Sequence, residues 1–199
     1  MEIKRTGQGQ LSKNSLLESL TKTHISVPLT IFFGASFIIS LFCLWMFEIT
    51  TSQLLLIYAI GFVSFTLIEY IVHRFVFHMN TYNAFRTRMQ YLIHGVHHEY
   101  PKDKARLAMP PVASVSIAIV LFSIFWMIGH VSGLAFGAGF VAGYAFYLCI
   151  HYSVHAFKPP RNFLRILWRF HSIHHYKNHD VAYGVTSPFW DLVFRTLPK

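Results

Sequence analysis

Long apolar stretches dominate this chain and are separated by polar segments of unequal length. The four stretches cover residues 26–47, 53–72, 112–131 and 134–152, each with about 20 residues, the helix length that crosses a bilayer core of about 30 Å. The first stretch is too long for a cleaved signal peptide, and no small-x-small cleavage site follows it. Only a few residues join the first stretch to the second and the third to the fourth. The pattern therefore predicts an all-α integral membrane protein with four transmembrane helices in two hairpins.

The composition supports this fold class and excludes several others. The chain has 199 residues, of which 54% are hydrophobic and 13% charged, whereas a soluble domain carries about 25% charged residues. A water-soluble globule, a disordered chain and a nucleic-acid-binding module are therefore excluded. The two cysteines, Cys43 and Cys149, lie in apolar stretches without metal-binding or redox spacing, and we expect them to be packing residues. The length indicates a single domain.

The net charge of +9 has an uneven distribution that predicts the topology. All 17 lysines and arginines lie in the polar segments 1–25, 73–111 and 153–199, which a four-span topology places on one side of the membrane. The positive-inside rule makes that side cytoplasmic. Both termini and a helical cap built from 73–111 and 153–199 are therefore expected in the cytoplasm. The charge thus marks topology rather than binding of DNA, with attraction of anionic headgroups or an acidic electron donor as a secondary role.

Ten of the 13 histidines form four clusters, and each cluster lies at or beyond the cytoplasmic end of a predicted span. The clusters are HxxxxH (His73, His78), HxxHH (His94, His97, His98), HxxxH (His151, His155) and HxxHH (His171, His174, His175). Because all four emerge on one side, they can converge on one site. We expect the other three, His24, His130 and His179, to lie outside it, with His179 near enough to support it.

The histidine spacing predicts two metal ions. Helical positions i, i+3 and i+4 share a face, so each HxxHH box can present three imidazoles in one direction. His73 and His78 are about 140° apart on an ideal helix, so they serve different ions or the helix is distorted there. Ten imidazoles exceed the ligand shell of one ion but suit two ions with four or five ligands each, of Zn, Fe, Cu or Ni rather than Mg or Ca. A structural zinc site needs far fewer ligands, which favours oxygen chemistry on a di-iron pair.

Two carboxylates are candidate supporting residues of the catalytic site. Glu69 lies one helical turn before His73 inside an apolar stretch, where a carboxylate is costly and usually functional. We expect it to accept a hydrogen bond from the N–H group of a metal-ligating histidine, the alternative being a neutral glutamic acid bonded between helices. Asp191 follows the last box and has the same expected role, as have Asp103 and Asp180. Local capping or ion pairing is the alternative for these aspartates.

The sequence around the boxes resembles the fatty acid hydroxylase / sterol desaturase superfamily, and most closely the fatty acid 2-hydroxylases. The resemblance covers most of the chain from Glu69 onward. Its specific matches are His94 to Asp103, Arg106-Leu107, Pro110-Pro111, His174 to Asn178, Gly184 to Ser187 and Phe189-Trp190-Asp191. Arg195 departs from the pattern, because a glycine is usual there.

The resemblance implies an iron-dependent, O2-consuming insertion of a hydroxyl group at the carbon next to an acyl carbonyl. The ten box histidines would then bind two Fe ions, for which Zn can substitute in purified protein. The substrate would be a free, CoA-linked or ceramide-linked acyl chain. Eukaryotic relatives often carry a cytochrome b5-type domain, which the 25 residues before the first stretch cannot hold. A separate electron donor is therefore expected: a ferredoxin, a cytochrome b5-like protein or a reductase.

Three alternatives stay open from the sequence. A carotenoid or sterol could be the substrate of the same chemistry, although the HxxxH box and the Arg-Leu…Pro-Pro sequence favour an acyl chain. Desaturation shares the first hydrogen abstraction with hydroxylation. A metal transporter usually needs polar groups at several depths of its spans, and here only Glu69 lies within one. The short form is expected in a bacterial inner membrane, or in the endoplasmic reticulum if the source is eukaryotic.

Overall fold

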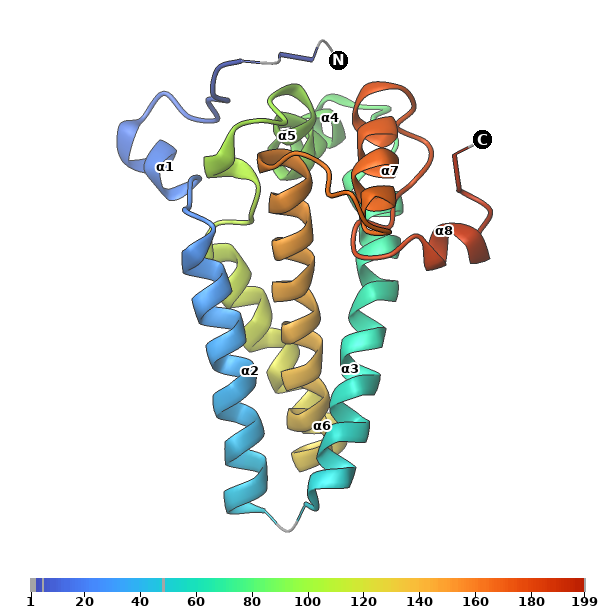
Figure 1. Cartoon of the computed structure of the whole chain (residues 1–199). Helices are drawn as coiled ribbons and strands as arrows, with labels where there is room; N and C mark the ends of the chain where they lie inside the picture. The colour runs from blue at the N-terminus through green and yellow to red at the C-terminus, as the bar shows by residue number, and fades with distance from the viewer. Residues whose placement is uncertain (1–2, 5, 48, 199) are drawn as a thin grey trace.

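The structure, a computed structural model, describes residues 3–4, 6–47 and 49–198 (Figure 1). Every regular element in these residues is helical, and no strand occurs among them. In chain order the elements are α1 (Ser15–Leu20), α2 (Ser26–Met46), α3 (Thr51–Val72), η1 (His73–Phe77), α4 (Ala84–Gln90), η2 (Tyr91–Gly95), α5 (Val96–Glu99), η3 (Lys104–Arg106), α6 (Pro111–Ala156), α7 (Arg165–Tyr176) and α8 (Phe189–Val193). Two of the 17 cations used in the topology prediction, Arg5 and Lys199, lie outside the described part.

Helices α2 and α3 agree closely with the first two predicted spans. Helix α3 is preceded by Thr50, whose hydroxyl accepts from the backbone N–H of Gln53, while the Gln53 side chain accepts from the backbone N–H of Thr50. This reciprocal capping satisfies amide groups that the first helical turn leaves unpaired. Each end of both helices lies within two residues of the boundary expected for the corresponding apolar stretch.

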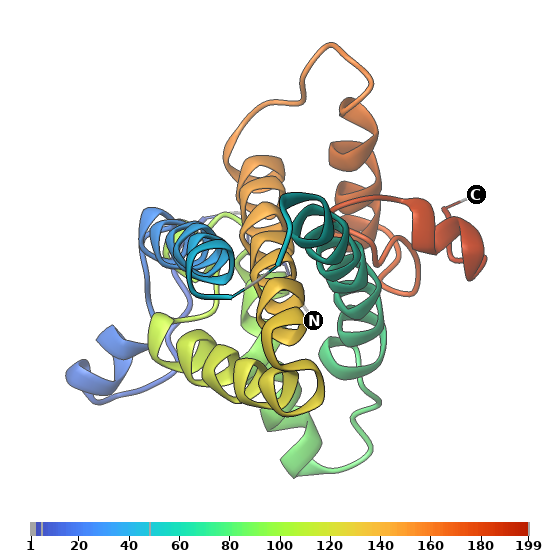
Figure 2. The same ribbon diagram turned by 90° about the horizontal axis from the view of Figure 1, so that it is seen from below.

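Helix α6 replaces the two separate spans that were expected at 112–131 and 134–152. It is a single assigned element of 46 residues, but its backbone breaks at His130, which has φ 47° and ψ −120°. The two arms fold back on one another, since the rings of Phe125 and Phe136 pack edge to face with centroids 5.0 Å apart. Figure 2 shows the arms lying beside each other, next to α2 and α3. The predicted turn of a few residues is thus a sharp reversal at one residue.

Three helical stretches of the described chain are long and apolar enough to cross a membrane: Ser26–Met46, Thr51–Phe77 and Lys104–Ala156. Their outward surfaces are apolar as well, because Ile38, Leu56 and Ile128 are each at least 64% exposed. Large exposed apolar surfaces of this kind are typical of contact with lipid rather than water. The chain thus has the architecture of a helical membrane protein.

The second arm of α6 packs closely against α3 because glycines remove the side chains between them. A Cβ atom on Gly139 would lie 2.0 Å from the carbonyl oxygen of Tyr58, and one on Gly61 would lie 2.1 Å from that of Phe136. These neighbours are backbone atoms, which cannot rotate away as a flexible side chain can. The approach therefore requires glycine at both positions.

We expect Gly139→Ala to lower the stability of the protein by about 1–3 kcal/mol, the usual cost of overpacking a close contact. Gly34→Ala is the matched control, because a Cβ atom there meets nothing within 4 Å. Thermal unfolding of both variants in detergent checks the expectation. Equal midpoints for the two variants would contradict it.

The remaining elements form a cap at one end of the long helices. Figure 1 shows α1, α4, α5, α7 and α8 gathered at this end together with both termini of the described chain. The cap is attached to the long helices directly, since η1 continues α3 without a break and α6 begins five residues after η3 ends. Segments far apart in the sequence are thereby brought together above the apolar bundle.

Candidate metal centre

The ten box histidines converge in the cap and separate into two groups of five. In each group every residue offers one ring nitrogen, and these nitrogens all lie within 4.8 Å of one another. Group 1 is His73, His78, His94, His98 and His174, and group 2 is His97, His151, His155, His171 and His175. All are buried except His78 and His155, which are partly exposed. The expected convergence is therefore present in the structure.

Each HxxHH box is divided between the groups, which the sequence did not predict. His94 and His98 belong to group 1, whereas His97 belongs to group 2. The last box has the opposite division, with His174 in group 1 and both His171 and His175 in group 2. Positions i and i+4 therefore stay together, while the intervening histidine turns toward the other group.

A π-helical turn explains the five-residue spacing of the first box. Residues His73–Phe77 form this turn, and the backbone N–H of His78 donates to the carbonyl oxygen of His73 at 3.2 Å. The wider turn brings His78 round to the side of His73, so that both belong to group 1. Of the two alternatives from the sequence, the structure shows the distorted helix, and it places His73 and His78 in the same group of histidines. Such π-turns occur frequently at functional sites.

Backbone carbonyl groups fix the rings of three histidines. The Nδ1–H of His73 donates to the carbonyl oxygen of Tyr183 at 2.5 Å, and that of His174 donates to Val181 at 2.8 Å. In group 2 the Nδ1–H of His151 donates to Leu107 at 2.9 Å. A carbonyl oxygen only accepts, so in each neutral ring the proton lies on Nδ1 and Nε2 carries a lone pair. These three Nε2 atoms are therefore set to bind a cation.

The facing ring nitrogens fit bound metal ions. The Nε2 atom of His174 lies 3.0 Å from that of His78, and the Nε2 atom of His151 lies 3.0 Å from that of His97. His175 has both ring nitrogens buried without a hydrogen-bond partner in the described structure. Buried polar atoms are normally satisfied, and five converging nitrogen lone pairs repel one another unless a cation lies among them. The donor set is all imidazole, which suits iron or zinc.

Burial keeps the cap histidines neutral, the state in which they bind metals. Removal from water, and then the neighbouring His78, lower the pKa of His174 to about 3. Burial, and then the neighbouring His179, lower the pKa of His78 to about 4. Burial also lowers the pKa of His94, His97 and His175 well below 6.5. A neutral imidazole needs no deprotonation before it coordinates an ion.

Glu69 and Asp191 lie beside group 1 but bind backbone instead of histidine. One oxygen of Glu69 accepts from the backbone N–H groups of Val185 and Thr186 at 2.6 and 2.9 Å, and the other accepts from the Thr186 hydroxyl. Asp191 accepts from the backbone N–H groups of Tyr183 and Gly184 at 2.9 and 2.8 Å. The expected direct bond from Glu69 to a histidine N–H is therefore wrong. The sequence contained no signal for the carbonyl groups that take this role.

The other histidines lie outside the two groups, as expected. His24 is exposed and forms a hydrogen bond of 2.7 Å with the Ser26 hydroxyl, and His130 occupies the reversal in α6. The ring of His179 is exposed with its centroid 4.9 Å from that of His98, so it borders group 1 without joining it. Cys43 packs in an apolar core with Leu54 and Ala135.

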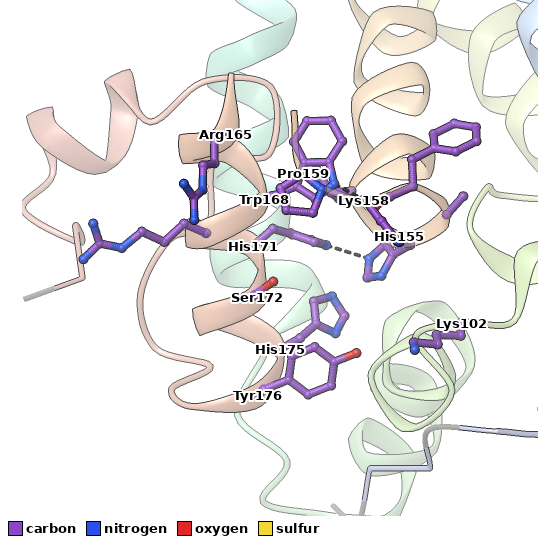
Figure 3. Close-up of a pocket in the computed structure, with 14 residues that line it drawn as sticks. Lys102, His155, Lys158, Pro159, Arg165, Trp168, His171, Ser172, His175 and Tyr176 are labelled. Atoms are coloured by element: carbon purple, nitrogen blue, oxygen red, sulfur yellow. Dashed lines mark hydrogen bonds between the residues drawn. The ribbon is translucent and has the colours of Figure 1, made fainter. Parts of the chain in front are cut away.

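A cavity of about 690 Å³ opens beside group 2. Figure 3 shows His155, His171 and His175 facing this cavity, with helix α7 on one side and Lys102 on the other. The indole N–H of Trp168 donates to the carbonyl oxygen of Phe157 at 3.0 Å and so holds the segment after α6 against α7. The cationic lining residues are Lys102, Lys158, Arg165 and Arg169. The cavity therefore places positive charge beside the histidines of group 2.

Long apolar helices beneath a cap with two five-histidine groups define a helical membrane protein with a candidate two-metal centre. The family model described as fatty acid hydroxylase matches residues 58–196, a region that contains all ten box histidines. The chain belongs to the fatty acid hydroxylase family.

Individual relatives agree with this family. The chain is 36% identical over 151 residues to the dihydroceramide fatty acyl 2-hydroxylase FAH2 of Arabidopsis thaliana, covering 75% of this chain and 64% of the relative. It is 40% identical over 144 residues to the ceramide very long chain fatty acid hydroxylase scs7 of Schizosaccharomyces pombe, covering 70% and 41%. The matched region thus spans less than two thirds of either relative.

A solved structure has the same fold. It is that of full-length scs7p, in which only the hydroxylase domain is visible, with a TM-score of 0.89 and 33% identity. The match covers 97% of this chain and 73% of that chain. The long helices and the cap therefore belong to one shared fold. The glycine usual at position 195 also has a structural explanation, because Arg195 has φ 58°, a conformation that favours glycine.

Proposed function

We propose that this protein is a membrane-bound di-iron, O2-dependent hydroxylase of lipid acyl chains. The proposed reaction is 2-hydroxylation of a fatty acid or of the acyl group of a ceramide. The observation that carries this proposal is the pair of five-histidine groups, in a chain whose relatives are named fatty acyl 2-hydroxylases. The balanced reaction consumes O2, two electrons and two protons, inserts one oxygen atom into a C–H bond and releases the other as water.

In this proposal the ten box histidines bind two iron ions, one in each group. Bound iron would supply the O2-dependent oxidising chemistry that side chains alone lack. Group 1 would use His73, His78, His94, His98 and His174, and group 2 would use His97, His151, His155, His171 and His175. Backbone carbonyl groups would hold His73, His151 and His174 in the tautomer that binds metal, and eight of the ten rings are buried away from bulk water. Zn²⁺ prefers the same ligands and can occupy the sites after purification.

The proposed position of the acyl group follows from the chemistry. Carbon 2 is bonded to the acyl carbonyl, so the polar end of the substrate has to lie close to the metal centre during reaction. The charged cavity beside His155, His171 and His175 is the space that we assign to this polar end. The remaining acyl chain would extend toward the apolar helices, where it is buried favourably.

We propose that α2, α3 and the two arms of α6 each cross the membrane, which gives four spans in two hairpins. The support is the reversal at His130, since a single span of 46 residues would be about 69 Å long at 1.5 Å per residue. The cap and both ends of the chain would then be cytoplasmic. The segment 1–25, the four spans and the cap form one hydroxylase domain in this proposal.

Electrons are proposed to come from a separate protein, either a ferredoxin, a cytochrome b5-like protein or a reductase. The cations at the cavity, among them Lys102 and Lys158, would attract an acidic donor at low ionic strength. Reconstitution with each donor, scored by turnover, identifies the partner.

Lipid mass spectrometry of cells with and without the gene tests the reaction. We expect acyl chains heavier by 16 Da, with fragmentation placing the hydroxyl group at carbon 2. A product lighter by 2 Da would show desaturation instead, and an oxidised carotenoid or sterol would contradict the acyl substrate. Metal uptake into proteoliposomes without any lipid product would contradict the enzyme and support transport.

A further inference from the structure

Group 1 is oriented by one short segment, Val181 to Thr186, which lies between α7 and α8. Its carbonyl groups at Val181 and Tyr183 accept from His174 and His73, as described above. The segment has no regular secondary structure of its own, so other contacts have to fix these two carbonyl groups.

Two buried carboxylates supply those contacts. Glu69 and Asp191 together accept four consecutive backbone N–H groups, from Tyr183 to Thr186. Glu69 is 7% exposed and Asp191 is 1% exposed, so water offers little competition for these bonds. The close fit also leaves no room at Gly184, where a Cβ atom would lie 2.3 Å from the carbonyl oxygen of Ser187. Each carboxylate therefore acts on the histidines through the backbone.

Group 2 has an unrelated anchor at Leu107, whose carbonyl oxygen accepts from His151. The preceding residue, Arg106, is buried and binds the N-terminal segment. Its Nε–H donates to the carbonyl oxygen of Gly9 at 3.0 Å, its Nη1–H donates to the Thr21 hydroxyl at 2.9 Å, and its Nη2 pairs with Glu18.

Further contacts hold this second anchor against the N-terminal segment. Asp103, which is 4% exposed, accepts from the backbone N–H of Gly9 at 3.1 Å. The backbone N–H of Thr23 donates to the carbonyl oxygen of Ala105 at 3.0 Å. The N-terminal segment thereby becomes part of the support of group 2, although it contains no box histidine.

We propose that the two metal ions are held by these two separate anchors, so that each ion can be lost without the other. Glu69 and Asp191 are positioning residues for group 1, and Arg106 and Glu18 are positioning residues for group 2. The inference rests on the proposed metal binding but not on the proposed hydroxylation. Groups that hold ligating histidines in place typically change metal affinity by about 10–100-fold when they are altered.

The experiment measures metal release from the full-length protein in lipid nanodiscs loaded with Zn²⁺. EDTA is added, and the Zn²⁺ that remains bound is followed by elemental mass spectrometry. Wild type should hold two ions per chain. We expect Glu69→Gln to release one ion about 10–100-fold faster while the other stays near its wild-type rate. Arg106→Gln should give the same pattern for the other ion.

Ligand variants identify which ion is released. His78→Ala with His98→Ala removes two members of group 1, and His155→Ala with His171→Ala removes two members of group 2. Each pair should leave one ion. The variant that lacks two group 2 histidines keeps its ion in group 1, so adding Glu69→Gln should speed the release of that ion. The variant that lacks two group 1 histidines keeps its ion in group 2, and adding Glu69→Gln should not change the rate at which that ion is released. Adding Arg106→Gln should speed the release of the group 2 ion and leave the release of the group 1 ion unchanged.

A matched control loses a charge without losing an anchoring contact. Arg88→Gln removes an exposed arginine near the second box. This variant should release both Zn²⁺ ions at the wild-type rate.

Two outcomes would overturn the inference: accelerated release of both ions by either anchor variant, or acceleration of the ion in the other group. General loss of folding would release both ions, so selectivity separates positioning from destabilisation. If Glu69→Gln does not fold, Thr186→Val removes one donor to Glu69 and should still speed one ion only. Two bound Zn²⁺ ions that are released selectively, without any hydroxylated lipid, would contradict the proposed function but would still support the inference of two separate anchors.

Discussion

Alanine at His174 or His97 should abolish lipid hydroxylation. His174 belongs to group 1 and His97 to group 2, so each substitution removes one ligand from a different group. Because both groups are needed as a unit, we expect the rate to fall by about 1,000-fold or more in each case. The measurement is the 2-hydroxy acyl product formed per milligram of membrane protein.

The apolar helices should insert normally in both variants, because neither residue lies in α2, α3 or α6. Equal amounts of protein in the membrane fraction verify this. His179→Ala is the matched control: its ring borders group 1, yet it is exposed and belongs to neither group. It should keep most of the activity. Full activity after both His174→Ala and His97→Ala would disprove the site.

Removal of the metal should have the second large effect, on both activity and stability. Chelation should stop turnover, and Fe²⁺ should restore it whereas Zn²⁺ should not, because zinc has no redox chemistry. An ion at 1,000 times its dissociation constant stabilises the folded state by about 4 kcal/mol, so the metal-free protein should unfold at a clearly lower temperature. Without a cation, the ten imidazoles, eight of which are buried, face one another with no opposite charge between them.

Thermal unfolding with and without each metal checks the stability, and turnover of the same samples checks the chemistry. Zn²⁺ should restore the unfolding temperature without restoring activity. Equal activity with either metal would contradict iron as the working ion. An unfolding temperature that does not respond to either metal would contradict metal binding within the cap.

Much of the fold could be predicted from hydrophobic length alone. Helices α2 and α3 begin and end within two residues of the expected positions, because about 20 apolar residues match the bilayer core. A reversal was expected between residues 131 and 134, next to Gly129 and Gly133, but its exact place at His130 was not, because packing of Phe125 against Phe136 fixes how the two arms meet. Local sequence signals are weak where packing decides the backbone.

The convergence of the histidine boxes was also predictable, but their division was not. Periodicity places His94, His97 and His98 on one helical face. In the structure His97 belongs with histidines of α6 and α7, whereas His94 and His98 belong with a different set. This division depends on where α6 and α7 lie, which the sequence of the box does not indicate. The bonds of Glu69 could not be predicted either. Its partners, Val185 and Thr186, lie over 100 residues away and use backbone atoms that any sequence would offer.

The position of α7 has a consequence for the biosynthesis of the protein. Group 1 needs His174 and group 2 needs His171 and His175, so neither group is complete without this one helix. Helix α7 follows α2, α3 and α6 in the chain, and chains are synthesised from the N-terminus at about 5–20 residues per second. All the apolar helices are therefore synthesised before the last histidines of either group. In the proposed function, each metal ion would therefore reach its full set of ligands only after α7 has been synthesised.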